Sequence, residues 1–149
     1  MSLAVSVSAD GVRPALSRER VAAIARRVLR AERVRHAMLS ITFVTRRAIS
    51  RLNAAHLGHP GATDVISFGF APARADGPVV GDVYIAPEVA RENARKHGER
   101  VRAETARLVI HGVLHVLGHD HPTNEDREGS AMWRRQEALL RRVQRAGAA

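Results

Sequence analysis

His111-Gly112-Val113-Leu114-His115-Val116-Leu117-Gly118-His119-Asp120-His121 is the most informative segment of this 149-residue chain. Its first half continues a nearly apolar run that predicts a buried central helix over residues 101–117. Gly118 is expected to end that helix. His111 and His115 are four residues apart and therefore project from one helix face, about one turn apart. Half of the eight histidines in the chain fall within this segment.

Two imidazoles at this spacing can bind one metal ion. After Gly118 the chain can turn back, which would bring His121 or His119 round as a third ligand. We predict His121, because the spacing His-x3-His-x2-Gly-x2-His follows the geometry of metzincin zinc proteases. Three neutral imidazoles with an open coordination position are typical of catalytic zinc, although they also accept Ni²⁺, Cu²⁺ or Co²⁺. His119 and Asp120 are the nearest candidates for a catalytic acid or base.

The segment has three other interpretations. Ordinary core histidines are disfavoured, because burying two of them in an apolar helix is costly unless each is paired or metallated. A zinc metalloprotease-like hydrolase needs a Glu directly after the first His as general base, and this chain has Gly112 there. Asp120 or another acid could act instead. The third interpretation is a non-catalytic RNA-binding factor in which zinc is structural.

Length and composition favour one soluble domain over residues 1–149. Hydrophobic residues make up 45% and charged residues 26% of the chain, which is typical of globular proteins. The chain has no cysteine, so any metal must be held by His, Asp or Glu. The apolar stretch 108–118 is far shorter than the roughly 20 residues of a membrane span, so no membrane partner is expected. The start lacks a basic signal-peptide region, and we expect a cytoplasmic protein.

The positive charge is concentrated at the two ends of the sequence. The formal net charge is +9, and Lys96 is the sole lysine among 24 basic residues. Clustered Arg suits a phosphate-backbone partner, so RNA is the leading candidate. Genomic base composition and solvated helix faces explain the same charge equally well. With only five aromatic residues, a base-stacking surface is not expected.

The hydrophobic pattern predicts an α+β fold, with a mixed sheet of about four strands, about five helices and the metal site on the buried central helix. Strands are expected near 1–8, 39–43, 64–68 and 79–85, with a connection or hairpin loop over 71–78. Helices are expected after Ser17, over about 49–56, over 87–97 and over 101–117. A last helix is expected to begin near Thr123–Asp126, with one apolar stripe: Met132, Leu139, Leu140 and Val143.

Residues 111–121 also resemble the hallmark of the YbeY family of bacterial endoribonucleases, H-G-x-L-H-x-x-G-[HY]-D-H. Leu52-Asn53 followed by residues 63–68 resembles that family's L-N…T-D-V-L-S-F, and residues 81–85 resemble its G-D-[IV]-x-[IL]. The resemblance implies an α+β fold with one Zn²⁺ per chain, held by His111, His115 and His121. It also implies maturation of the 3′ end of 16S rRNA by cleavage of single-stranded RNA, late-stage ribosome quality control, and contacts with the small ribosomal subunit and assembly proteins.

One position departs from the family pattern. Members commonly carry an Arg six residues before the T-D pair, where this chain has Leu57. Either another Arg supplies that charge, or RNA cleavage is weakened or altered. His56 and His59 flank the position and could add polar contacts, although loop histidines are more often simply solvated. Asp64 and Asp82 could each orient a metal ligand, but capping and turn roles are at least as common.

Overall fold

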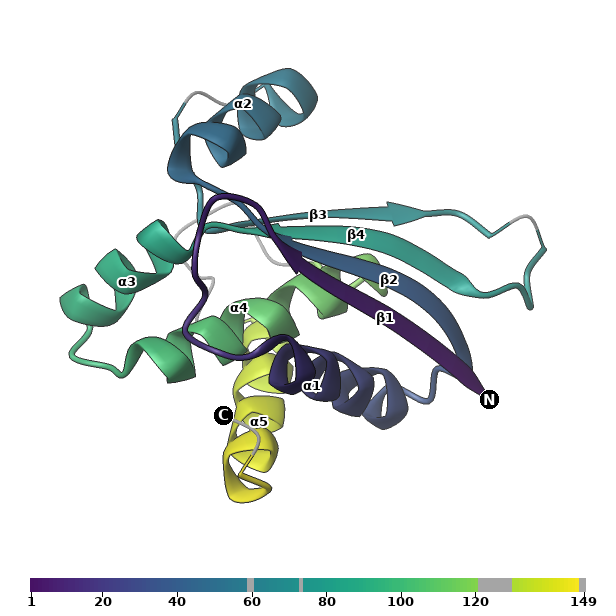
Figure 1. Cartoon of the computed structure of the whole chain (residues 1–149). Helices are drawn as coiled ribbons and strands as arrows, with labels where there is room; N and C mark the ends of the chain where they lie inside the picture. The colour runs from purple at the N-terminus through teal and green to yellow at the C-terminus, as the bar shows by residue number, and fades with distance from the viewer. Residues whose placement is uncertain (59–60, 73, 121–129, 148–149) are drawn as a thin grey trace.

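The computed structural model describes residues 1–58, 61–72, 74–120 and 130–147. Within them four strands form one sheet and five helices surround it (Figure 1). The strands are β1 (Ser2–Ala9), β2 (His36–Phe43), β3 (Val65–Phe70) and β4 (Val79–Ile85). The helices are α1 (Arg18–Ala31), α2 (Arg46–Leu57), α3 (Pro87–Lys96), α4 (Val101–Val116) and α5 (Ala131–Arg145).

The sheet is mixed, as predicted, and its strand order is β1-β2-β4-β3. β1 pairs with β2 and β2 pairs with β4 in parallel, whereas β3 and β4 are antiparallel. The antiparallel pair confirms that residues 71–78 connect the strands of a hairpin. β3 therefore lies at one edge of the sheet, beside the strand that follows it in sequence.

Two helices cover one face of the sheet. Alternating exposure along β2 and β4 shows that every second side chain, such as Ile41 and Val83, points into the main core. α1 packs against β1, and α4 packs against β3 and β4. α5 packs on α4, and α2 lies on the opposite side of the sheet (Figure 1). The central helix is thus enclosed by the sheet and by other helices.

Helix starts follow their capping residues. The Ser17 hydroxyl accepts a hydrogen bond from the Arg20 backbone N–H, and Thr45 caps α2 in the same way through Ala48. Gly98 and Gly118 have φ angles of +63° and +95° and follow the ends of α3 and α4. The expectation that Gly118 ends the central helix is confirmed.

The start of the last helix was predicted too early. α5 begins at Ala131, where the Ser130 hydroxyl accepts from the Trp133 backbone N–H and caps the helix. The proposed cap at residues 123–126 lies outside the described residues. The apolar stripe was predicted correctly, since Met132, Leu139, Leu140 and Val143 are all buried. In the described part of the chain, no helix has both the length and the apolar character needed to cross a bilayer.

Candidate metal centre

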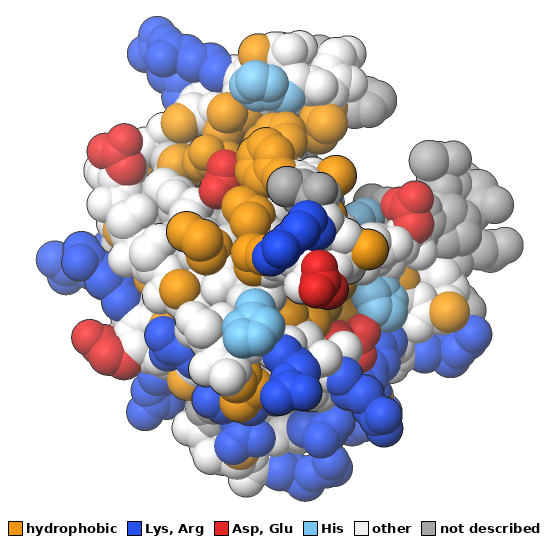
Figure 2. Space-filling view, turned by 90° about the vertical axis from the view of Figure 1, so that its right-hand side faces the viewer, with side chains coloured by type: hydrophobic (Ala, Val, Ile, Leu, Met, Phe, Trp, Pro, Cys, Tyr) orange, Lys and Arg blue, Asp and Glu red, His pale blue; other side chains and the backbone are white. Residues whose placement is uncertain are grey.

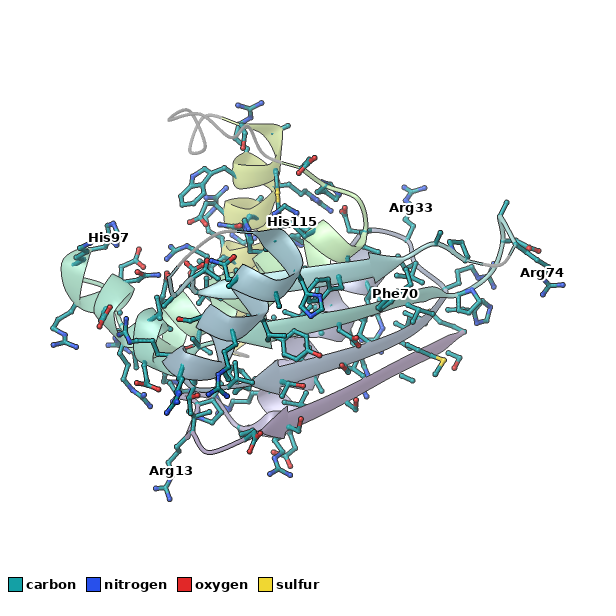
Figure 3. All side chains as sticks on the ribbon, turned by 90° about the horizontal axis from the view of Figure 1, so that it is seen from above. Arg13, Arg33, Phe70, Arg74, His97 and His115 are labelled. Atoms are coloured by element: carbon teal, nitrogen blue, oxygen red, sulfur yellow. The ribbon has the colours of Figure 1, made fainter. Side chains whose placement is uncertain are left out.

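His111 and His115 lie on one face of α4, as their spacing predicts. Their ring centroids are 4.7 Å apart and their ring planes are inclined by 72°. Both residues are half-buried. Figure 3 shows His115 well inside the outline of the molecule, whereas His97 lies at its outer edge. The structure therefore brings together two imidazoles that are close enough to share a cation.

His111 is oriented by a buried amide on the neighbouring helix. Its Nδ1 lies 2.6 Å from Oε1 of Gln136, a residue of α5 that is only 2% exposed. Gln136 Nε2 donates to Glu137 Oε2 at 3.1 Å, which sets the amide so that its oxygen faces the imidazole. His111 is then protonated at Nδ1, and its Nε2 carries the lone pair. Metal-binding histidines usually donate their other ring nitrogen in this way, so the pair fits a metal centre.

The third predicted ligand, His121, lies outside the described residues. Over residues 1–58, 61–72, 74–120 and 130–147, no three His, Asp or Glu side chains are grouped to hold a metal ion. The described part of the candidate centre is therefore the pair His111 and His115, and His121 stays a prediction.

His119, predicted to be a catalytic acid or base, is held by a carboxylate of α1. Its Nε2 lies 2.5 Å from Oε1 of Glu32, the residue that ends α1. Arg135 Nε donates to the other oxygen of Glu32 at 2.9 Å. Partial burial opposes ionisation of Glu32, but the hydrogen bonds from Arg135 and His119 hold its pKa below the ordinary value. His119 belongs to residues 111–121, which we call the histidine segment, and its contact with Glu32 connects this segment to α1 and α5. Asp120 is exposed.

A cavity of about 530 Å³ lies beside His111, between α3, α4 and α5. Arg107 lines this cavity and donates hydrogen bonds to three carboxylates. Its Nη1 donates to Glu104 at 2.7 Å, its Nε to Glu137 at 2.9 Å, and its Nη2 to Glu99 at 3.1 Å. Burial opposes the charge of Arg107, but these hydrogen bonds raise its pKa above the ordinary value. This wall of the cavity is therefore a network of paired charges.

Asp64, from the T-D pair, lines the same cavity. Asn93 Nδ2 donates to Asp64 Oδ2 and to Glu104 Oε2, both at 3.1 Å, so one amide joins the two carboxylates. Burial raises the pKa of Glu104, against the hydrogen bonds from Arg107 and Asn93, which lower it. Asp82 differs. It accepts from Ser40 Oγ at 2.8 Å and lies on the sheet face opposite α4, away from the histidine pair.

Close packing against the sheet explains why position 112 holds glycine and not the glutamate of zinc proteases. A Cβ at this position would lie 2.5 Å from Val83 Cγ1, a clash with the sheet. Ser67 Oγ also donates to the Gly112 carbonyl at 3.0 Å, which fixes this turn of α4 against β3. A side chain at position 112 would point into the core and not toward the histidines. The protease interpretation therefore loses its general base for a packing reason.

Leu57 is the last residue of α2 and is 46% exposed. Gly58 follows in the left-handed conformation, with φ +68°. His56 packs edge-on against Phe68, with ring centroids 5.4 Å apart, so it has a packing role on that side of the sheet. His59 lies outside the described residues.

Sequence reasoning did not identify Gln136, Glu32 or Arg107. One signal for Gln136 was available, because it interrupts the apolar stripe that runs from Met132 to Val143. A polar residue at a core position usually has a buried partner. The sequence held no comparable signal for Glu32 or Arg107, whose partners come from distant segments.

Comparison with known proteins supports the family resemblance. The family model described as Endoribonuclease YbeY matches residues 8–144. An Endoribonuclease YbeY from Beutenbergia cavernae is 45% identical over 72% of this chain and 77% of its own length. Another from Thermobifida fusca is 38% identical over 82% of this chain and 83% of its own length. The solution structure of TM1509 from Thermotoga maritima has the same fold, with a TM-score of 0.60 at 22% identity, and covers 93% of this chain and 88% of its own.

Proposed function

The chain belongs to the YbeY endoribonuclease family, and from that membership we propose a zinc-dependent endoribonuclease that cleaves single-stranded RNA. The observation that supports a metal centre is that His111 and His115 lie together on one face of α4, with His111 hydrogen-bonded to Gln136. His111, His115 and His121 would hold the ion. Zinc bound there supplies Lewis-acid chemistry for phosphodiester hydrolysis.

The protein's own residues prepare this centre. Gln136 accepts a hydrogen bond from His111 Nδ1, which favours the tautomer with its lone pair on Nε2. Glu32 holds His119 by a hydrogen bond to its Nε2. We propose His119 and Asp120 as the residues that move protons during cleavage. For His119, this role requires that its hydrogen bond to Glu32 leave the second ring nitrogen to exchange a proton.

The biological role proposed is that implied by the family resemblance. It is maturation of the 3′ end of 16S rRNA and late-stage ribosome quality control in the cytoplasm, in contact with the small ribosomal subunit and its assembly proteins. The basic termini of the chain support an RNA partner. Because Leu57 stands at the usual Arg position, we propose that arginines on other elements bind the RNA backbone; the alternative is that RNA cleavage is weakened or altered.

The proposal is tested by cleavage of a single-stranded rRNA fragment by the wild type and by His115→Ala. His36→Ala is the matched control, since this exposed histidine begins β2. We expect His115→Ala to lose bound zinc and cleavage together, and His36→Ala to keep both. Zinc-dependent cleavage by His115→Ala would contradict the proposal.

The same preparations separate the two alternatives. Hydrolysis of casein that persists in excess RNA would favour the metalloprotease. A zinc-loaded wild type that cleaves no RNA, and a His115→Ala variant that is only less stable, would favour a non-catalytic, zinc-containing ribosome-assembly factor in which zinc is structural.

A further inference from the structure

A second concave surface lies away from the cavity beside His111, where α1 meets α5. We call it the α1/α5 groove, and its volume is about 620 Å³. Its lining combines small or apolar side chains with basic ones. The lining residues are Ala23, Val28, Ala31, Leu139 and Val143 together with four arginines: Arg26, Arg27, Arg30 and Arg142.

The charge of this groove is uncompensated. In the part of the chain that the structure describes, no carboxylate lines it. Glu32, the acidic residue nearest in sequence, is already paired with His119 and Arg135. Arg27, Arg30 and Arg142 are exposed, and Arg26 is anchored by donating from Nε to the Leu3 carbonyl at 3.2 Å. Figure 2 shows Lys and Arg side chains gathered over the lower part of the molecule, the level at which α1 and α5 lie in Figure 1.

The groove is linked to His119 through the end of α1. Ala31 lines the groove, and its carbonyl accepts from Arg135 Nη2 at 3.4 Å. The next residue, Glu32, binds His119 at the end of the histidine segment. A chain lying along the groove past the end of α1 would therefore arrive beside residues 119–120.

We propose that the α1/α5 groove binds the phosphate backbone of single-stranded RNA that extends from the cleavage site. Guanidinium groups bind phosphate oxygens bidentately and displace counterions from the RNA. The groove has arginines but no lining aromatic side chain, so it would bind the backbone without reading the bases. This inference rests on the proposed RNA substrate. In it, arginines of α1 and α5 supply positive charge that is missing at position 57, where this chain has Leu57 in place of the family's usual Arg.

The test is a binding measurement made in chelator, where metal-dependent cleavage stops. Fluorescently labelled single-stranded RNA of about 16 nucleotides is titrated against the wild type and against Arg27→Gln/Arg142→Gln, at several salt concentrations. Because both residues are exposed, the variant should fold normally. We expect affinity to fall roughly fivefold or more, and the slope of log K against log salt to become shallower by about 1.4, which is about 0.7 for each lost contact.

The matched control is Arg13→Gln/Arg74→Gln, which removes the same charge at two outlying points of the molecule (Figure 3). We expect this variant to bind RNA nearly as well as the wild type. Equal losses in both variants would show that only net charge matters, and would overturn the inference. Tighter binding of the wild type to anionic lipid vesicles than to RNA would overturn it as well.

Failure of the groove and failure of the proposed function give different results. Cleavage of an oligonucleotide of about four nucleotides by the metal-loaded wild type tests the function alone, because such a strand is too short to occupy both sites. If the wild type cleaves it and the groove variant binds the long RNA normally, the groove inference is wrong and the function stands. If the wild type cleaves no RNA but the groove variant loses RNA binding, the α1/α5 groove binds RNA and the proposed cleavage function is wrong.

Discussion

At the residue scale, the hydrogen bond between Gln136 and His111 makes a prediction about metal affinity. Gln136→Leu keeps the size of the side chain but removes the oxygen that accepts from Nδ1. Loss of such a partner typically weakens metal binding about 10- to 100-fold. We expect that loss in a zinc competition assay, whereas Gln144→Leu, an exposed site on the same helix, should bind zinc normally. Unchanged zinc affinity in Gln136→Leu would show that the amide does not support a ligand.

Glu104 and Glu99, both bound to Arg107, should respond to pH in opposite directions. Burial raises the pKa of Glu104, so its contribution to stability is present below its unfolded pKa and is lost as pH rises through the folded pKa. Hydrogen bonds from Arg107 lower the pKa of Glu99, so its contribution is present above its unfolded pKa and is lost as pH falls.

The measurement is urea unfolding of Glu104→Gln and Glu99→Gln between about pH 3 and about pH 8. The free energy of unfolding of Glu104→Gln, relative to that of the wild type, should increase as pH rises above about 4.5, the usual range of a glutamate. The free energy of unfolding of Glu99→Gln, relative to that of the wild type, should decrease as pH rises toward about 4.5 and then stay constant. The same pH trend in both variants would contradict the assigned directions.

The placement of His111 and His115 on one helix face could be predicted from sequence, but the residues that contact the histidines from other helices could not. His111 and His115 share a helix, so their spacing alone places them on one face. Gln136 and Glu32 reach the histidine segment from other helices, and that depends on how α1, α4 and α5 pack. The predicted roles of His119 and Asp120 stay predictions, as does His121, which lies outside the described residues.

At the element scale, the close packing of α4 on the sheet makes Gly112 sensitive to substitution. Gly112→Ala should gain up to about 1 kcal/mol of helix propensity, but its Cβ would lie 2.5 Å from Val83 Cγ1. Overpacking typically costs about 1 to 3 kcal/mol, so we expect net destabilisation in urea unfolding. Val83→Ala should partly relieve that cost when combined with Gly112→Ala. If Gly112→Ala alone stabilises the protein, then α4 does not approach the sheet this closely.

The kinds of element were predictable because their hydrophobic patterns are clear. Alternation in residues 39–43 and the 3.6-residue period after Ser17 predicted β2 and α1. The strand order was not predictable, because parallel pairing of β2 with β4 joins segments separated by α2 and β3. The start of α5 was missed because two capping sequences were available, and Ser130 lies closer to the apolar stripe than residues 123–126.

At the scale of the whole molecule, the net charge of +9 makes a prediction about salt. Like charges crowded on α1 and α5 repel one another in the folded state, and salt screens that repulsion. Raising ionic strength from about 0.01 M to about 0.15 M should therefore raise the Tm. Arg27→Gln/Arg142→Gln should show a smaller rise, because two of the crowded charges are gone. A fall in Tm with salt would mean that attractive ion pairs outweigh the repulsion.

The central claim is that a metal held by the histidine segment is required for RNA hydrolysis. The most direct test is to titrate the purified protein with a chelator while following zinc release and cleavage of single-stranded RNA in the same sample. We predict about one zinc per chain at the start, and a loss of cleavage in proportion to the zinc released. Full cleavage after the zinc has been removed would contradict the claim, as would a zinc-loaded protein that cleaves no RNA.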